Sequence, residues 1–273
     1  MTQIQLTAAS TPRGHYGFSQ VARMEWAKLR SLRSTTWILL ILAAGMIGLA
    51  ILLLSQYPSN WAHMTAAERA SFDPTETGFV GLALGQLAVG VLGVLTITSE
   101  YSSGMIRATL SAVPRRGMLL TAKAVVTGAL MLAAGEVLAF GAFLAGQAVL
   151  AAPAPHATLG QPGVLRAVLL AGAYLWLIGL IGLGLGTVIR HTAGAIGTLV
   201  GVVFVLPLIT LAMPDSIQHT ATQFFPEAIA ENSLTAVKPV AYSLTPWAGL
   251  GMLGLYAAAL LVIGGWLLAR RDA

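Results

Sequence analysis

The sequence predicts an all-α integral membrane protein with six transmembrane helices. Of its 273 residues, 56% are hydrophobic and only 9% are charged, whereas an ordinary soluble domain carries about 25% charged residues. Six apolar segments approach or exceed the roughly 20 residues that a helix needs to cross a bilayer. Lys and Arg gather in alternate connections between these segments. A surface this apolar suits lipid rather than water.

The six segments form one predicted transmembrane domain that covers residues 1–273. We expect the spans at about 36–56, 78–98, 124–150, 167–189, 193–213 and 247–269. The first apolar run is too long for the core of a signal peptide and is expected to remain as an anchor. Glu136 lies deep in the third span, where an acid is costly and indicates a functional site. A structural acid that hydrogen-bonds neighbouring helices is the alternative, and the sequence leaves both open.

The distribution of positive charge predicts the orientation. Twelve of the fifteen Lys and Arg residues fall in the N-terminal tail, the second and fourth connections and the C-terminal end. Only Arg69, Arg166 and Lys238 fall on the other side. Since cytoplasmic connections carry the excess of basic residues, both termini are expected in the cytoplasm. Most of the acids lie in the opposite connections, namely Glu68, Asp73, Glu76, Asp215, Glu227 and Glu231.

Residues 18–33 have the pattern of a helix that lies on the membrane surface. Its apolar face contains Phe18, Val21, Ala22, Leu29 and Leu32. The basic residues opposite or beside that face are Arg23, Lys28, Arg30 and Arg33. Such a helix places its cations at anionic headgroups. Glu25 falls in the middle of the apolar face, so it is expected either to have a cationic partner or to be protonated.

The second connection, residues 99–123, is the longest uninterrupted polar stretch on the predicted cytoplasmic side. Gly104 permits a sharp turn, and Pro114 ends any helix before it. A short helix between them would expose Ile106 and Leu110 below the membrane, where a soluble partner could bind. The alternative is that its basic residues only contact anionic lipid.

Two further patterns concern helix packing and the long connection at 214–246. Phe225, Pro226 and Glu227 belong to a stretch of mixed polarity, which predicts one or two short helices that enter the outer leaflet. Three glycine pairs have the spacing that lets membrane helices approach closely. They are Gly81 with Gly85, Gly182 with Gly186, and Gly197 with Gly201.

The motifs of several enzyme classes are missing from the sequence. None of the three lysines lies in a phosphate-binding P-loop, and there is no Gly-x-Ser-x-Gly or His-Glu-x-x-His motif. The chain has no cysteine, so thiolate metal sites are excluded. We therefore expect no ATP site, no metal and no enzymatic activity in this chain. Its net charge of +5 follows the predicted topology and does not indicate nucleic-acid binding.

Two segments resemble the ABC-2 type permeases, the membrane subunits of bacterial ABC exporters. They are Glu25-Trp26-Ala27-Lys28-Leu29-Arg30-Ser31, before the first span, and Glu100 to Leu110 followed by Pro114-Arg115-Arg116. Phe225-Pro226 and the ending Arg270-Arg271-Asp272 are also similar. The preference for arginine over lysine fits a GC-rich bacterial genome.

The resemblance implies an exporter in the bacterial cytoplasmic membrane. Two permease subunits, identical or different, would pair with two separate ATPase subunits that hold ATP and Mg, so this chain would need no cofactor. The tail would form an interfacial helix, and the segment before the sixth span would be re-entrant. The coupling helix and its flanks would comprise Glu100, Tyr101, Gly104, Ile106, Arg107, Leu110, Pro114, Arg115 and Arg116. A membrane-embedded hydrolase and a non-transporting scaffold or sensor are the rival hypotheses.

Overall fold

A computed structural model describes residues 17–236 and 244–271, and throughout these ranges the regular secondary structure is helical. In chain order the helices are α1 (Phe18–Ser31), α2 (Arg33–Leu54), α3 (Tyr57–Asn60), the 3-10 helix η1 (Trp61–His63), α4 (Ala66–Ser71), α5 (Pro74–Gly78), α6 (Leu82–Ser102), α7 (Met105–Ala112), α8 (Arg116–Val149), α9 (Val164–Ile189), α10 (Thr192–Val200), the π-helix η2 (Gly201–Val205), α11 (Leu206–Thr210), α12 (Asp215–Thr222), α13 (Pro226–Leu234) and α14 (Pro246–Arg270). Lys238, on the side opposite most of the basic residues, and Asp272, in the C-terminal segment, lie outside the described residues.

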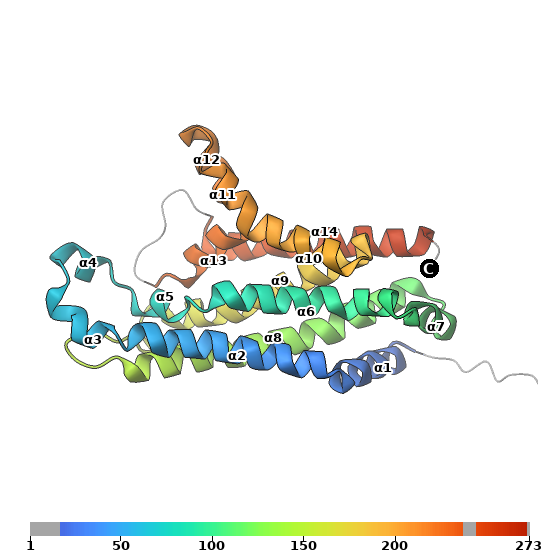
Figure 1. Cartoon of the computed structure of the whole chain (residues 1–273), viewed down its shortest axis with the longest axis horizontal. Helices are drawn as coiled ribbons and strands as arrows, with labels where there is room; N and C mark the ends of the chain where they lie inside the picture. The colour runs from blue at the N-terminus through green and yellow to red at the C-terminus, as the bar shows by residue number, and fades with distance from the viewer. Residues whose placement is uncertain (1–16, 237–243, 272–273) are drawn as a thin grey trace, which may run out of the picture.

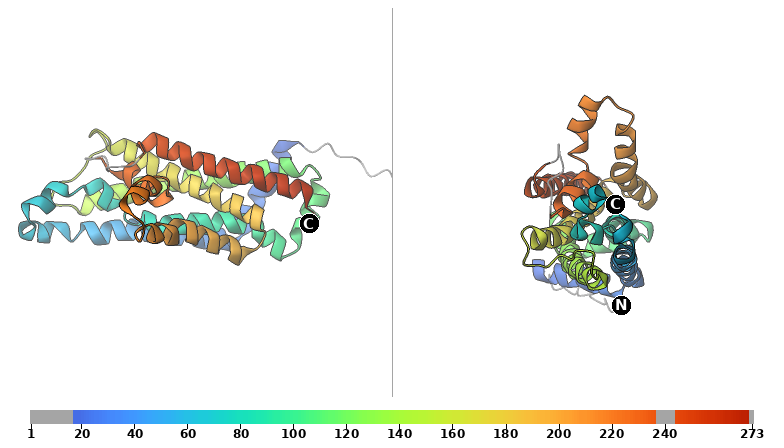
Figure 2. Two further views of the ribbon diagram at one scale, coloured as in Figure 1. Left: turned by 90° about the horizontal axis from the view of Figure 1, so that it is seen from above. Right: turned by 90° about the vertical axis from the view of Figure 1, so that its left-hand side faces the viewer.

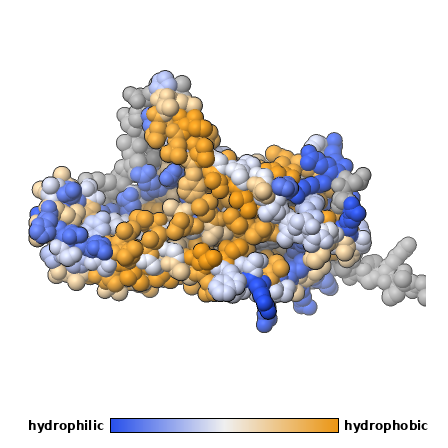
Figure 3. Space-filling view, in the orientation of Figure 1, coloured by the Kyte–Doolittle hydropathy of each residue, from blue (hydrophilic) through white to orange (hydrophobic). Residues whose placement is uncertain are grey.

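Six helical segments in the described ranges are long and apolar enough to cross a membrane, as the sequence predicts. They are Arg33–His63, Leu82–Ser102, Arg116–Val149, Val164–Ile189, Thr192–Thr210 and Pro246–Arg270. On the face drawn in Figure 3, apolar residues cover much of the middle of the bundle, and hydrophilic residues gather toward both ends. The fold is therefore that of a multi-pass helical membrane protein.

Helix α9 is the centre of the bundle. It contacts α6, α14, α8 and α10, and 72% of its most apolar window is buried inside the chain. A helix that is apolar all round is expected to be enclosed in this way. Its glycines allow the neighbours close, since the backbones of Gly182 in α9 and Gly90 in α6 are in direct contact. Helix α2 packs on α8 and α6, on the side of the bundle away from α14 (Figure 1).

The bundle has two distinct ends, which we call the α7 end and the α4 end. Helices α1 and α7 lie at the same end as the C-terminus, whereas α3 and α4 lie at the other (Figure 1). The alternation of long helices thus brings together the connections that are rich in Lys and Arg.

The fifth spanning segment leaves the bundle. It starts against α9 and α6 as α10, then continues through η2 and α11, which lean away from the other helices (Figure 2). The π-helix and Pro207 mark the change of direction, and both features bend helices. Leu208 is 65% exposed beyond this point, so the segment meets few other helices of its own chain.

At the α7 end the helix boundaries differ from the bounds of the predicted segments. Helix α8 begins at Arg116 rather than near residue 124, and α6 continues to Ser102 rather than ending near 98. Helix α1 ends at Ser31, and Arg33 begins α2 instead of belonging to the interfacial helix. An apolar run marks the thickness of the bilayer, whereas a helix continues into polar residues until a breaker such as Pro114 or Gly104 stops it.

Candidate functional site: a buried ion cluster at the α7 end

Four charged side chains from three helices meet at the α7 end. Lys123 Nζ lies 2.5 Å from Glu25 Oε2 and 2.7 Å from Glu100 Oε1. Lys28 Nζ lies 3.0 Å from Glu25 Oε1 and 2.9 Å from Glu100 Oε1. Each lysine therefore pairs with both acids. We call these four residues the ion cluster.

The cluster is enclosed by the packing of α1 against α8. Val21, Glu25 and Leu29 are spaced four residues apart, and together they form the buried side of α1. Val21 packs with Val113 and Leu119 around the first turns of α8. Glu25 lies between two apolar neighbours and is only 2% exposed. Of the two expectations for Glu25, a cationic partner or a protonated carboxyl, the structure shows the cationic partner.

The charges within the cluster balance, and three of its four side chains are almost fully buried. Lys123 is 1% exposed, Glu25 is 2% exposed and Glu100 is 3% exposed. Lys123 also donates to the carbonyl of Thr96 at 3.3 Å. Buried ions are tolerated when opposite charges and hydrogen bonds replace the lost hydration. Removing one of the four side chains would leave the buried charges of its partners without an opposite charge.

Lys28 lies at the rim of the cluster. Burial alone would lower the pKa of Lys28, but the hydrogen bond to Glu100 and the charges of Glu25 and Glu100 outweigh it and raise that pKa above its usual value. The lysine also donates to Thr109 Oγ1 in α7 at 3.2 Å. A cavity of about 360 Å³ opens beside the cluster. Glu100 Oε2 is buried and has no hydrogen-bond partner among the described residues.

Helix α7 folds back beneath α6 and packs on the bundle. Gly104 links the two helices with a φ of 72°, a left-handed conformation that favours glycine. Ile106 is 3% exposed and belongs to the main hydrophobic core, against which Leu110 packs half-buried. The expectation that these two residues are exposed is wrong, because their apolar side faces the protein itself.

The outward surface of α7 contains only some of the residues expected there. Glu100 is buried in the ion cluster and is absent from this surface. We use the name outer face of α7 for the exposed residues Met105, Arg107, Ala108 and Ser111 of α7, together with the exposed Arg115 at the start of α8. Pro114 is also exposed, at the turn before α8. Arg107 and Arg115 are thus the charged residues of the predicted site that are exposed on this face.

Tyr101 and Arg116 join this region to two other helices. Arg116 Nη1 donates to the carbonyls of Leu268 at 2.7 Å and Arg271 at 3.0 Å. These bonds satisfy carbonyls at the end of α14, which lack partners within the helix. The guanidinium of Arg190, at the end of α9, lies 5.3 Å from the centre of the Tyr101 ring. Side chains at the α7 end therefore connect the ends of α6, α8, α9 and α14.

The remaining predicted residues lie apart from the cluster. Trp26 and Arg30 are exposed on α1. Phe225 and Pro226 begin α13, whose Glu227 is exposed at its first turn. These residues share no site with α7.

The contacts of Lys123 and Thr109 with the ion cluster are not predicted by the sequence analysis. Lys123 follows the segment that resembles the ABC-2 type permeases, and contact with anionic lipid is the alternative that the sequence offers for it. Among the described residues no group of three or more His, Cys, Asp or Glu could hold a metal ion.

No protein-family model matches this chain, and no curated protein matches its sequence.

Proposed function

We propose that this chain is the permease subunit of a bacterial ABC-2 type exporter, driven by a separate ATPase that docks on the outer face of α7. The observation that supports this most is α7 itself, a short helix outside the spanning segments. Its outer face presents Arg107, with Arg115 at the start of α8, and its inner side packs on the spanning helices. The permease would act with a second permease subunit and two ATPase subunits, and it would bind no cofactor of its own.

The contacts of α7 suit it to transmit movement. Its inner side is held by Ile106 in the main core and by Thr109 at the ion cluster. The cluster joins α1, α6 and α8 through charged hydrogen bonds, which are stronger than neutral ones. A shift imposed on α7 by a partner would therefore move these helices together, as coupling through a packed network requires.

The same proposal assigns the α7 end to the cytoplasm. Most Lys and Arg of the chain are at this end, as expected for a cytoplasmic surface. Helix α1, with Trp26 exposed, would lie along the inner leaflet. Helices α12 and α13 would then form the re-entrant segment on the outside, and the membrane would be the bacterial cytoplasmic membrane.

We predict that a cysteine at Ala67 reacts with a membrane-impermeant thiol reagent added to intact cells, whereas one at Ser111 reacts only after the cells are opened. Both positions are exposed, in α4 and α7 respectively. The natural chain has no cysteine, so labelling reports only the introduced residue. The reverse pattern of labelling would contradict the proposed orientation.

The docking proposal is tested by charge reversal on the outer face of α7. Arg107→Glu should lower the amount of ATPase that co-purifies with the chain by about tenfold, a loss of about 1.4 kcal/mol, because like charges would meet where complementary ones are expected. The ATPase to use is a P-loop protein encoded beside this chain. Arg30→Glu is the matched control, since Arg30 is exposed at the same end but lies on α1.

Equal recovery of the ATPase with both variants would exclude α7 as the docking element. Failure of any P-loop ATPase to co-purify with the natural chain would favour the scaffold hypothesis instead. Measuring ATP turnover with and without the chain separates binding from coupling.

A further inference from the structure

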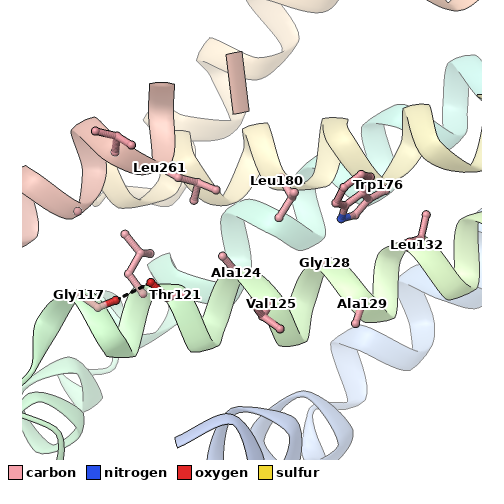
Figure 4. Close-up of a pocket in the computed structure, with 13 residues that line it drawn as sticks. Gly117, Thr121, Ala124, Val125, Gly128, Ala129, Leu132, Trp176, Leu180 and Leu261 are labelled. Atoms are coloured by element: carbon pink, nitrogen blue, oxygen red, sulfur yellow. Dashed lines mark hydrogen bonds between the residues drawn. The ribbon is translucent and has the colours of Figure 1, made fainter. Parts of the chain in front are cut away.

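A lateral groove runs between α8, α9 and α14 and holds about 580 Å³. Its walls are almost entirely apolar, with Ala124, Gly128 and Leu132 on α8 facing Trp176 and Leu180 on α9 (Figure 4). Leu261 of α14 contributes the third wall. This volume and lining are typical of pockets for small apolar ligands.

Small residues on α8 give the groove its depth. A Cβ atom at Gly128 would lie 2.9 Å from Nε1 of Trp176. The indole therefore occupies space that any larger residue at position 128 would take. Figure 4 shows Trp176 directed from α9 toward α8 within the groove. A ligand in the groove would therefore contact the indole ring of Trp176.

Glu136 lies one helical turn beyond the end of this groove. On α8 it follows Leu132 by four residues, and it packs on Gly172, which precedes Trp176 by four residues on α9. A Cβ at Gly172 would come within 2.5 Å of the Glu136 carboxyl carbon. Glu136 Oε2 is buried and has no hydrogen-bond partner among the described residues. The groove thus leads to an acid in the spanning region without a cation beside it.

We propose that the groove binds a lipophilic cation, with the apolar body along α8 and α9 and the positive charge toward Glu136. An acid within the bilayer is costly unless an opposite charge accompanies it. A cation would supply that charge, whereas a neutral lipid chain would not and an anion would be repelled. The Trp176 ring adds attraction for a cation near its face.

This inference deepens the proposed function, because such a cation would be the substrate class of the exporter. Binding itself needs neither the ATPase nor transport, so the two proposals can fail separately. Binding of the cation without ATP-driven export would contradict only the proposed function. Export without binding at this groove would contradict only the inference.

The test measures binding of tetraphenylphosphonium to the full chain in nanodiscs by equilibrium dialysis, with empty nanodiscs subtracted. We expect saturable uptake at one site and none for tetraphenylborate, which has the same shape and the opposite charge. Glu136→Gln should weaken the affinity by about tenfold or more, equivalent to about 1.4 kcal/mol. Glu76→Gln, which alters an acid in α5 at the α4 end, should leave it unchanged.

A second variant keeps the test independent of Glu136. Ala124→Leu places a larger side chain in the groove far from the carboxyl and should also reduce uptake. Correct folding of each variant is checked by monodisperse size-exclusion. The proposal is overturned if the natural chain shows no saturable uptake of the cation. It is equally overturned if Glu136→Gln binds as tightly as the natural chain.

Discussion

Lys123→Met is expected to destabilise the folded chain by about 3–5 kcal/mol, the cost of breaking a buried ion pair by removing one partner. The ammonium of Lys123 contacts both Glu25 and Glu100, and its side chain is 1% exposed. Without it two carboxylates remain with only Lys28 at the rim. Unfolding in mixed detergent micelles, monitored by tryptophan fluorescence, measures the change.

Arg115→Gln is the matched control, because it removes a positive charge that is exposed and lies eight residues earlier in the chain. Its effect should stay within about 0.5 kcal/mol, as for surface substitutions in general. Equal stability of the two variants would show that the cluster contributes little to folding.

Paired substitutions separate the cost of an orphaned charge from the value of the pair. Glu25→Gln together with Lys123→Met removes one charge of each sign, leaving Lys28 opposite Glu100 at 2.9 Å. The double variant should therefore be less destabilised than the sum of the single variants. Lys28→Met should cost less than Lys123→Met, since the Lys28 side chain is 23% exposed and water can replace part of its contacts.

The six spans could be predicted because lipid imposes one requirement on every spanning helix, namely about 20 apolar residues. The helix ends could not be predicted as well. Residues 116–123 are helical although they are partly polar, because α1 and α7 cover them. Hydropathy indicates whether a helix segment lies in lipid or in water. It does not indicate which other helices of the chain cover that segment.

The ion cluster could also be predicted only in part. The cost of burying a charge predicted that Glu25 has a cationic partner or is protonated. The identity of its deepest partner depends on how α1 docks against α8, since Lys123 lies 98 positions away in the chain. Ile106 was misassigned for a related reason. An amphipathic pattern gives the direction of the apolar side of α7 but does not say whether this chain or another one covers it.

The glycine pairs have the same spacing, but they differ in whether another helix packs closely against them. A Cβ at Gly182 would lie 2.2 Å from the carbonyl oxygen of Gly90, so this glycine is required for the approach of α9 to α6. A Cβ at Gly197 or Gly201 would meet nothing within 4 Å. Spacing alone cannot distinguish these cases, because a four-residue interval recurs by chance in a chain with 30 glycines.

Gly93→Ala tests the α6–α9 contact directly and should prevent normal packing of the bundle. The added Cβ would lie 2.0 Å from the carbonyl oxygen of Gly179 and 2.9 Å from the amide nitrogen of Leu183. Both atoms belong to the backbone, so no side-chain rotation relieves the overlap, and α9 as a whole must move. Overpacking of a core costs about 1–3 kcal/mol and occasionally more. We expect this variant at or above the upper end, because α9 is the central helix.

Gly197→Ala provides the comparison, with the same chemical change on a helix where the methyl group meets open space. Alanine favours a helix over glycine by about 0.8–1.0 kcal/mol, so this variant should be as stable as the natural chain or slightly more so. The yield of monodisperse protein and the unfolding midpoint distinguish the two. If Gly93→Ala matched Gly197→Ala in both measurements, the close approach of α6 to α9 would not be a determinant of the fold.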